Sequence, residues 1–216
     1  MTLGVTLGGM PLLHAVREWR IDRMTDRVAR RPHGRKARET YGAADAHSFA
    51  WEPVLAALKL GPDDRLLDVG CGGGVFLRHA VEQTGCRATG LDHSREMVRL
   101  ARSSSGVDVV HGEADELPFA DGAFTAVSCL VAFFFFPDAV AALREMRRVL
   151  DPQHGRLAIF TTAPEAKGTE AAPYPLATRG HFYSDEELAV VGRDAGFSGV
   201  EVVRTDEWAQ LLVAQP

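Results

Sequence analysis

The chain has few cysteines and no long apolar run. Its three cysteines, Cys71, Cys86 and Cys129, include no CxxC pair among the 216 residues. A sparse, odd set argues against a disulfide framework and for a reducing compartment, so we expect a cytoplasmic protein. No apolar run approaches the roughly 18–20 residues that a membrane-spanning helix needs. The N-terminus lacks the basic region and the strong apolar core of a secretion signal, so we expect none.

The charge is unevenly distributed along the chain. The net charge of −5 gives no overall case for nucleic-acid binding. Residues 1–50, however, hold eight Arg and one Lys against five acids, a net charge of +4, which leaves −9 for the rest. The first fifty residues therefore differ in character from the remainder.

Residues 11–31 have the apolar spacing of a helix and carry a basic stripe. The arginines that recur every three or four residues are Arg17, Arg20, Arg23, Arg27 and Arg30 or Arg31. The stripe fits a solvated helix face, a homodimer contact, an anionic substrate or RNA. RNA ranks last, because it would need several aromatic stacking groups and Trp19 is the one aromatic residue in this helix.

From residue 64 the pattern changes to alternating strands and helices. The expected strands are 64–70, 87–92, 107–114, 124–132 and 155–163, and the expected helices are 73–85, 94–106 and 138–151. This alternation predicts a doubly wound α/β fold, in which helices cover both faces of a mostly parallel sheet. A helix over 184–196 and strands over 199–205 and 208–216 should follow, the strands as an antiparallel pair at the sheet edge.

We expect one domain with two variable parts. Residues 1–50 read as an N-terminal helical lid or extension, and residues 51–216 as the main domain. Residues 163–183, rich in Ala, Pro and Gly at their start, read as a variable loop. The N-terminal helix and this loop should together cover the site.

The strongest motif is the glycine-rich stretch "LLDVGCGGGVFL" at residues 66–77. Glycines between a strand and a helix let the backbone approach a ligand and expose the free amides of the helix start. A dinucleotide fingerprint would place its third glycine at position 75, which is Val75. The spacing G-x-G-x-G fits instead, through Gly70, Gly72 and Gly74, and no Gly-Lys-Ser/Thr follows to make a P-loop.

Two acids accompany this glycine loop. Asp68 ends the preceding strand, and Asp92, 22 residues after Gly70, ends the next one. The carboxyl ends of adjacent parallel strands meet at one edge of a sheet, where ligands of such folds bind. Asp92 is placed to hold the vicinal hydroxyls of a ribose.

Four segments in this order resemble the class I S-adenosylmethionine-dependent methyltransferases. They are "LLDVGCGGG", "GLDHSREMVRLAR", "GEADELPFADGAFTAVSC" and "ALREMRRVLDPQHGRLAIF", and the resemblance covers roughly residues 50–215. Within the family, the chain is similar to the broad group of ubiquinone and menaquinone biosynthesis methyltransferases and natural-product small-molecule methyltransferases. The resemblance implies a Rossmann-like sheet of seven mostly parallel strands with an antiparallel edge strand and an N-terminal helical cover.

The resemblance implies S-adenosylmethionine as cofactor and assigns residues to its methionine end. Those residues are Asp68, Gly70, Cys71, Gly72, Gly74 and Cys129. Asp68 would lie beneath the amino group, and Gly70 and Gly72 would contact the amino-acid portion. Cys129, at the end of the fourth strand, would face the same end.

The resemblance also assigns residues to the ribose and the adenine of the cofactor. Asp92 would bind both ribose hydroxyls, and Met97 and His93 would border the adenine. Glu113 would accept a hydrogen bond from the adenine amino group, although it is one methylene longer than the family's usual Asp. Ala114 would offer its backbone amide to the ring.

The run "LVAFFFFPDAV", residues 130–140, follows the fourth strand at the end that should face the site. Because alternate residues of a strand point to opposite faces, the four rings cannot all share one side. We expect one or two of the rings, from Phe133 and Phe134, to reach the acceptor, and the others to lie under the next helix, capped by Asp138. The alternative is that all four belong to the core.

The predicted reaction is in-line transfer of a methyl group to a small, partly apolar or aromatic acceptor. A general base is needed only if the acceptor keeps its proton, and His181, His47 and Tyr41 are candidates. His181 also stands as a substrate-contacting candidate, although its place in a loop favours an exposed surface position. We expect no metal, because His and Cys lack ligand spacing.

Three other functions stay open for the sequence. One is an RNA or protein methyltransferase, and another is a regulatory protein that binds S-adenosylmethionine without transferring its methyl group. A nicotinamide-dependent oxidoreductase is disfavoured by Val75.

Overall fold

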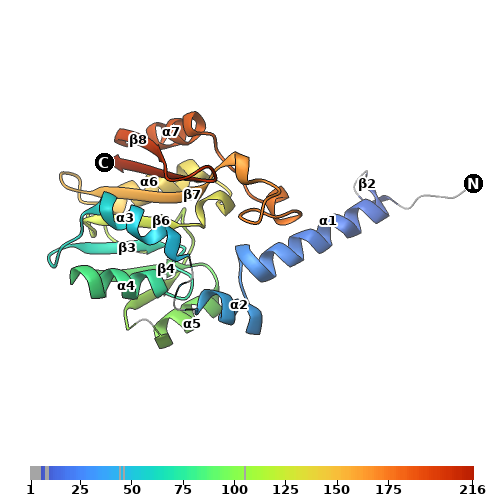
Figure 1. The fold of residues 1–216 in the computed structure, drawn as a ribbon, viewed down its shortest axis with the longest axis horizontal. Helices are drawn as coiled ribbons and strands as arrows, with labels where there is room; N and C mark the ends of the chain where they lie inside the picture. Colours follow the sequence, from blue (N-terminus) through green and yellow to red (C-terminus); the bar gives the residue numbers. More distant parts are fainter. Residues whose placement is uncertain (1–5, 8–9, 44, 46, 105) are drawn as a thin grey trace, which may run out of the picture.

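A seven-stranded sheet with helices on both faces forms the body of the molecule (Figure 1). The computed structural model describes residues 6–7, 10–43, 45, 47–104 and 106–216. The strands of the sheet are β3 (Arg65–Val69), β4 (Arg87–Asp92), β5 (Asp108–His111), β6 (Ala126–Leu130), β7 (Arg156–Thr162), β8 (Ser198–Arg204) and β9 (Ala209–Gln215). They lie in the order β5-β4-β3-β6-β7-β9-β8.

Strands β3 to β7 are parallel, and β9 runs antiparallel to both of its neighbours. The predicted sheet of seven mostly parallel strands is confirmed. The last two strands form the antiparallel pair expected at one edge, with β9 inside and β8 outermost. Strand β3 has β4 on one side and β6 on the other, so its carboxyl end is the switch point at which open α/β sheets bind ligands.

Apolar side chains alternate along the central strands and bury both faces of the sheet. Leu66 belongs to the cluster on the side of α3 (Trp51–Leu58), α4 (Val75–Thr84) and α5 (Arg95–Ser104). Leu67 and Val69 belong to the cluster on the side of α6 (Ala139–Val149) and α7 (Asp185–Asp194). This alternation follows from the two-residue period of a strand, and it places the buried Asp68 on the same face of β3 as Leu66.

Side-chain caps begin the two helices on the second face. Asp138 accepts a hydrogen bond from the amide of Ala141 at 2.9 Å, which confirms its predicted cap on α6. Ser184 and Glu187 form a reciprocal capping box at the start of α7.

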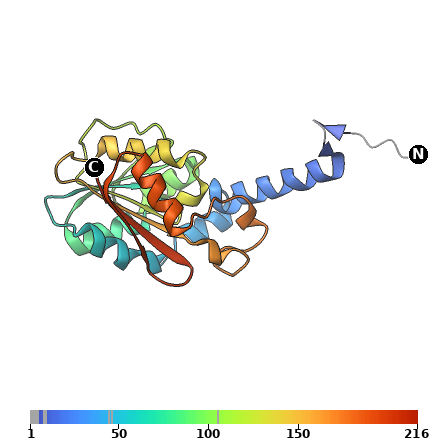
Figure 2. The ribbon, with the colours of Figure 1, turned by 90° about the horizontal axis from the view of Figure 1, so that it is seen from above.

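The N-terminal elements are β1 (Thr6–Leu7), β2 (Met10–Pro11), α1 (Leu12–Thr25), the π-helical segment η1 (Asp26–Arg30), α2 (Arg35–Tyr41) and the 3-10 turn η2 (Ser48–Ala50). The helix expected over 11–31 is thus divided into α1 and η1. Both Figure 1 and Figure 2 show α1 extending away from the sheet, so α1 itself does not cover the site as expected. Val16, Trp19 and Met24, whose spacing predicts the helix, are exposed on it.

The cover is formed by later residues of the extension. Ser94 donates to the carbonyl of Pro32 at 2.8 Å, and the amide of Gly34 donates to Glu96 at 2.9 Å. Arg38 also pairs with Glu96. These contacts hold the segment between α1 and α2 against the start of α5. Residues 1–5, 8–9, 44 and 46 of the predicted 1–50 unit lie outside the described residues, and its boundary at residue 50 stays a prediction.

The loop expected over 163–183 folds into two short turns, η4 (Pro164–Ala166) and η5 (Leu176–Thr178). Its buried side chains form a small apolar cluster with Phe134, which lies in the 3-10 turn η3 (Phe133–Phe135) after β6. The loop therefore covers the carboxyl ends of the strands from the side opposite α2. In the described part of the chain, no helix is long and apolar enough to cross a membrane.

Candidate active site

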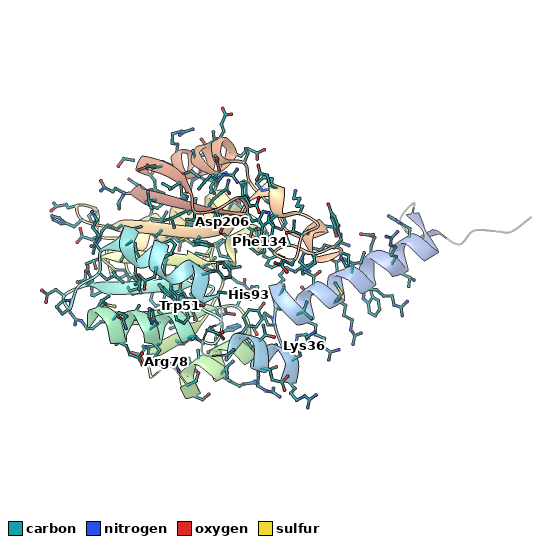
Figure 3. The ribbon with its side chains drawn as sticks, viewed as in Figure 1. Lys36, Trp51, Arg78, His93, Phe134 and Asp206 are labelled. Carbon is teal, nitrogen blue, oxygen red and sulfur yellow. The ribbon has the colours of Figure 1, made fainter. Side chains whose placement is uncertain are left out.

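A cavity of about 570 Å³ opens at the carboxyl ends of β3, β4 and β6. It is bounded by the glycine loop, the end of β4, the segment after β5, the turn η3 and the N-terminal cover. Figure 3 shows His93 beside the base of α1 and Phe134 above it, and both residues line this cavity, as does Trp51. Segments that are far apart in the sequence thus meet at the predicted switch point.

The glycine loop is a tight backbone cradle. Gly70 has a φ of +79°, and a Cβ added to it would lie 2.8 Å from the Cβ of Ala132. A Cβ on Gly73 would lie 2.2 Å from the carbonyl oxygen of Tyr41. The N-terminal cover therefore rests directly on the loop, and only a glycine at position 73 permits that approach.

The carboxylate of Asp92 is fixed by two backbone amides. Gly72 donates to its Oδ2 at 2.8 Å, and Ser94 donates to its Oδ1 at 2.7 Å. Burial raises the pKa of Asp92, and the two amide hydrogen bonds act against that rise. Each oxygen keeps a free lone pair, so a ligand hydroxyl can still be bound.

Asp68 is the second buried acid of the cavity. Its Oδ1 accepts a hydrogen bond from the hydroxyl of Ser128 at 2.7 Å. Burial raises the pKa of Asp68 to about 7, and the charge of Asp92 adds to the rise, whereas the Ser128 hydrogen bond opposes it. Two buried carboxyl groups in one cavity favour an occupant with a positive charge.

The residues expected around the adenine gather at one end of the cavity. His93, Met97, Glu113 and Ala114 all line it. His93 Nδ1 lies 3.5 Å from a carboxylate oxygen of Glu113, and His93 Nε2 hydrogen-bonds to the carbonyl of Arg30. The N-terminal cover therefore also contacts this end.

Phenylalanines form the apolar wall of the cavity. Phe134, Phe135 and Phe136 line it, but Phe133 is fully buried in the core, where its ring lies 5.7 Å from that of Tyr183. The expected pocket position of Phe133 is thus wrong, whereas Phe134 lines the cavity as expected. Phe135 and Phe136, which we expected to lie under the next helix, line the cavity too. Strand β6 ends at Leu130, and Phe133–Phe135 form a 3-10 turn. A 3-10 turn has three residues per turn, so its side chains do not alternate between two faces as they do in a strand.

Three other predicted site residues lie outside the cavity lining. Gly74 precedes α4 with a φ of +75°, where it shapes the helix start. Cys129 is buried in the core on the α6–α7 side, because the strand alternation turns it away from the loop. His181 is exposed and stacks on Tyr183 at 4.1 Å, in agreement with the surface alternative.

The two N-terminal candidates do line the cavity. Tyr41 donates its hydroxyl to the carbonyl of Val28 at 3.1 Å, and burial together with Asp92 raises the pKa of Tyr41 to about 12. His47 lies between the rings of Tyr41 and Phe49, with centroids 5.8 and 6.0 Å away. Burial lowers the pKa of His47, so its imidazole is neutral at pH 7.

Sequence reasoning missed several lining residues. They include Arg30, Arg31, Trp51, Phe135, Phe136, Ala171 and Leu176. Trp51 Nε1 is buried without a hydrogen-bond partner in the described part of the chain. No local signal in the sequence marks Trp51 or the two arginines.

No three His, Cys, Asp or Glu side chains of the described residues are grouped so that they could hold a metal ion. The expectation that no metal is needed stays a prediction.

Comparison with known proteins identifies relatives of this chain. A model of the methyltransferase domain matches residues 67–159, which run from β3 to β7. Demethylmenaquinone methyltransferase of Staphylococcus aureus (strain JH9) is 32% identical, over 73% of this chain and 78% of its own length.

Two solved structures share the fold. A SAM-dependent methyltransferase from Aquifex aeolicus has a TM-score of 0.69 and 24% identity, over 83% of this chain and 96% of its own. Geranyl diphosphate C-methyltransferase from Streptomyces coelicolor A3(2) has a TM-score of 0.66 and 18% identity, over 85% of this chain and 86% of its own.

The chain belongs to the class I S-adenosylmethionine-dependent methyltransferases. It is a methyltransferase enzyme of that family, and S-adenosylmethionine is the cofactor that the family implies.

Proposed function

We propose that this enzyme methylates a small, partly apolar or aromatic acceptor by in-line displacement. The observation that carries the proposal is that one cavity joins the two acids and the glycine loop to a wall of three phenylalanines. The relative from S. aureus supports it, because it is named for a small-molecule acceptor, demethylmenaquinone.

The residues of the polar end fit S-adenosylmethionine. Asp68 would pair with the amino group of the methionine portion, and Asp92 would accept hydrogen bonds from the ribose hydroxyls. The unpartnered Nε1 of Trp51 is a donor that a ligand carboxylate would satisfy. Gly70 and Gly72 leave room for the amino-acid portion of the cofactor.

The residues at the other end of the cavity fit the adenine of the cofactor. Met97 supplies an apolar surface, and Glu113 and the amide of Ala114 supply an acceptor and a donor for the edge of the adenine. His93, tied to the N-terminal cover through Arg30, would close over the same end.

Bound S-adenosylmethionine supplies a methyl group on a positively charged sulfur, which becomes a neutral thioether when the acceptor takes the methyl group. The chain's own part is to align the acceptor and to exclude water, and holding two reactants in contact supplies much of the acceleration. Phe134, Phe135 and Phe136 would hold an apolar acceptor, with the loop residue Leu176 closing over it.

An acceptor that keeps its proton needs a base, and we assign that role to His47. Burial lowers the pKa of His47, so its imidazole is neutral at pH 7 and can accept a proton, and it lines the cavity. Tyr41 is the weaker candidate, because a hydroxyl with a pKa of about 12 stays protonated and already donates to Val28.

The test is release of S-adenosylhomocysteine from the purified enzyme with a panel of acceptors. The panel contains demethylmenaquinone, simple phenols, amines, short peptides and RNA, each with wild type and with His47→Gln. Turnover of a small apolar or aromatic compound supports the proposal. Turnover confined to RNA or peptide overturns it, in favour of a polymer-methylating enzyme.

His47→Gln distinguishes a role of His47 as general base from a role in binding the acceptor. With a phenol acceptor we expect kcat to fall and its rise with pH through the imidazole titration to disappear, while KM changes little. An unchanged pH profile would exclude His47 as the base. The cytoplasmic location inferred from the cysteines stays a prediction.

A further inference from the structure

A second concave surface lies outside the active site. It is a groove of about 590 Å³ between α1 and η1 on one side and α2 on the other. Its lining residues are Trp19, Arg20, Arg23, Met24, Arg27, Val28, His33, Lys36, Ala37 and Thr40. Figure 3 shows Lys36 on α2, below the base of α1. None of these residues lines the active-site cavity.

The cations of this groove have no acidic partners within the described part of the chain. Arg20, Arg27 and Lys36 form no ion pair there, and Arg23 lies over the ring of Trp19 at 5.3 Å. The groove thus presents a concentrated positive charge on a protein whose net charge is −5.

The acids of α1 and η1 are engaged elsewhere. Glu18 and Asp22 pair with Arg179 of the 163–183 loop at 2.5 and 2.8 Å, and Asp26 pairs with Arg30 at 2.6 Å. The acids therefore pair with Arg179 and Arg30, which lie outside the groove, and the cations of the groove are left without them.

Exposed apolar side chains lie among these cations. Trp19 is 57% exposed, Val16 is 46% exposed, and Met24 and Val28 are also exposed. A helix that combines arginines with Trp and aliphatic side chains suits the interface of a membrane with anionic lipids. Because α1 extends away from the sheet in both views, its face is free to meet a flat surface (Figures 1 and 2).

The groove and the active site share one wall. In η1, Arg27 and Val28 line the groove, whereas Asp26 and Ala29 line the cavity. A surface that contacts the groove would therefore lie next to the cover of the acceptor site. This step rests on the proposed function, because only an apolar acceptor would gain from such a location.

We propose that the α1–η1–α2 groove binds anionic lipid headgroups and docks the enzyme on a membrane surface. A second copy of the chain fits the groove less well, because a two-fold contact would bring Arg20 and Arg23 against their own equivalents. RNA also fits less well, because Trp19 is the one aromatic side chain in the groove.

The test is flotation of the full-length enzyme with vesicles, without cofactor or acceptor. One set contains phosphatidylglycerol and phosphatidylcholine, and the other contains phosphatidylcholine alone, each at low and high salt. We expect binding to the anionic vesicles only, weakened by salt. Because no acceptor is present, a failure to bind vesicles would not count against the proposed methylation of a small acceptor. A failure to methylate small acceptors would likewise not count against vesicle binding.

Charge-reversal variants locate the surface. Arg20→Glu with Arg23→Glu should weaken vesicle binding by about 30-fold or more, since each surface cation contributes about 1 kcal/mol. The matched control, Arg87→Glu with Arg193→Glu, makes the same change in net charge at exposed positions outside the groove and should bind like wild type. Equal loss in both double variants, or no binding by wild type, would overturn the proposal.

Trp19 provides an independent readout. Its fluorescence should shift to the blue on anionic vesicles, and that shift should be absent in Trp19→Phe, which keeps every charge. Two other results would replace the membrane with a different occupant. One is tighter binding to a single-stranded RNA that displaces vesicles, and the other is a dimer in analytical ultracentrifugation that Arg20→Glu with Arg23→Glu dissociates.

Discussion

The amide of Gly72 donates to the carboxylate of Asp92 at 2.8 Å, so the acid that ends β4 fixes the glycine loop that follows β3. The second oxygen of Asp92 is held by the amide of Ser94. One side chain thus connects two neighbouring strand ends and keeps the loop in the shape that the cavity requires.

Asp92→Asn should weaken cofactor binding because an amide presents an NH₂ group to one of the two backbone amides. It also removes the charge that would hold the ribose hydroxyls. Hydrogen bonds to charged groups contribute about 1.5–3 kcal/mol, so we expect S-adenosylhomocysteine to bind about 10- to 150-fold more weakly. Isothermal titration calorimetry measures this change.

The matched control for Asp92→Asn is Asp63→Asn, at an exposed position in the turn before β3. It removes the same charge and should leave the affinity unchanged. Equal affinities for Asp92→Asn and wild type would show that Asp92 shapes the loop without touching the cofactor.

The positions of Asp68 and Asp92 could be predicted, because a strand–glycine–helix pattern places each acid at a strand end and parallel strands bring those ends together. The place of Phe133 could not, because the end of β6 at Leu130 is set by packing. Val131 adopts a φ of +57° there, which no local preference of a β-branched residue would indicate.

The contacts of the N-terminal cover with the site were still harder to predict from the sequence. His93 contacts the carbonyl of Arg30, and Tyr41 rests on Gly73, across separations of tens of residues. Such contacts depend on how the N-terminal helices pack against the folded sheet, which the local sequence does not determine. The direction of α1, away from the sheet, follows from the same cause.

Asp68 should make the stability of the cofactor-free enzyme depend on pH. Its pKa is about 7 in the folded chain against 3.8 for an ordinary Asp, so the folded state retains a proton that the unfolded state loses. Stability from this group is therefore full below pH 3.8, falls as pH rises and levels off above about 7. The total loss is of the order of 4 kcal/mol.

Urea denaturation at several pH values measures this effect, with Asp68→Asn as the comparison. From pH 4 to pH 7, the unfolding free energy of wild type should fall relative to that of Asp68→Asn. A difference that stays constant over that range would show that Asp68 is ionised throughout. S-adenosylhomocysteine should bind wild type more tightly as pH rises through 7, because ionised Asp68 attracts its amino group.

Gly73→Ala tests whether the N-terminal cover must touch the glycine loop. The new Cβ would overlap the carbonyl oxygen of Tyr41, so α2 and η1 must move outward. We expect a loss of about 1–3 kcal/mol in stability and faster amide exchange over residues 28–41.

The control for Gly73→Ala is Gly61→Ala, where the nearest atom to the new Cβ is Asp64 Oδ2 at 4.0 Å. Neither glycine has a positive φ, so backbone strain does not separate the two variants. Unchanged exchange in Gly73→Ala would mean that the cover closes without the loop contact.

Phe133→Ala and Phe135→Ala should have different effects, although the two residues lie two positions apart. Phe133 is fully buried in the core, so its removal should cost about 3–5 kcal/mol of stability. Phe135 lines the cavity, so its removal should cost less stability and raise KM for an apolar acceptor by about tenfold, from the lost contact area. Thermal denaturation and steady-state kinetics on the same two proteins measure both effects. If Phe133→Ala folds stably and only it raises KM, the acceptor lies on the core side of η3, and the wall of the cavity has been assigned to the wrong rings.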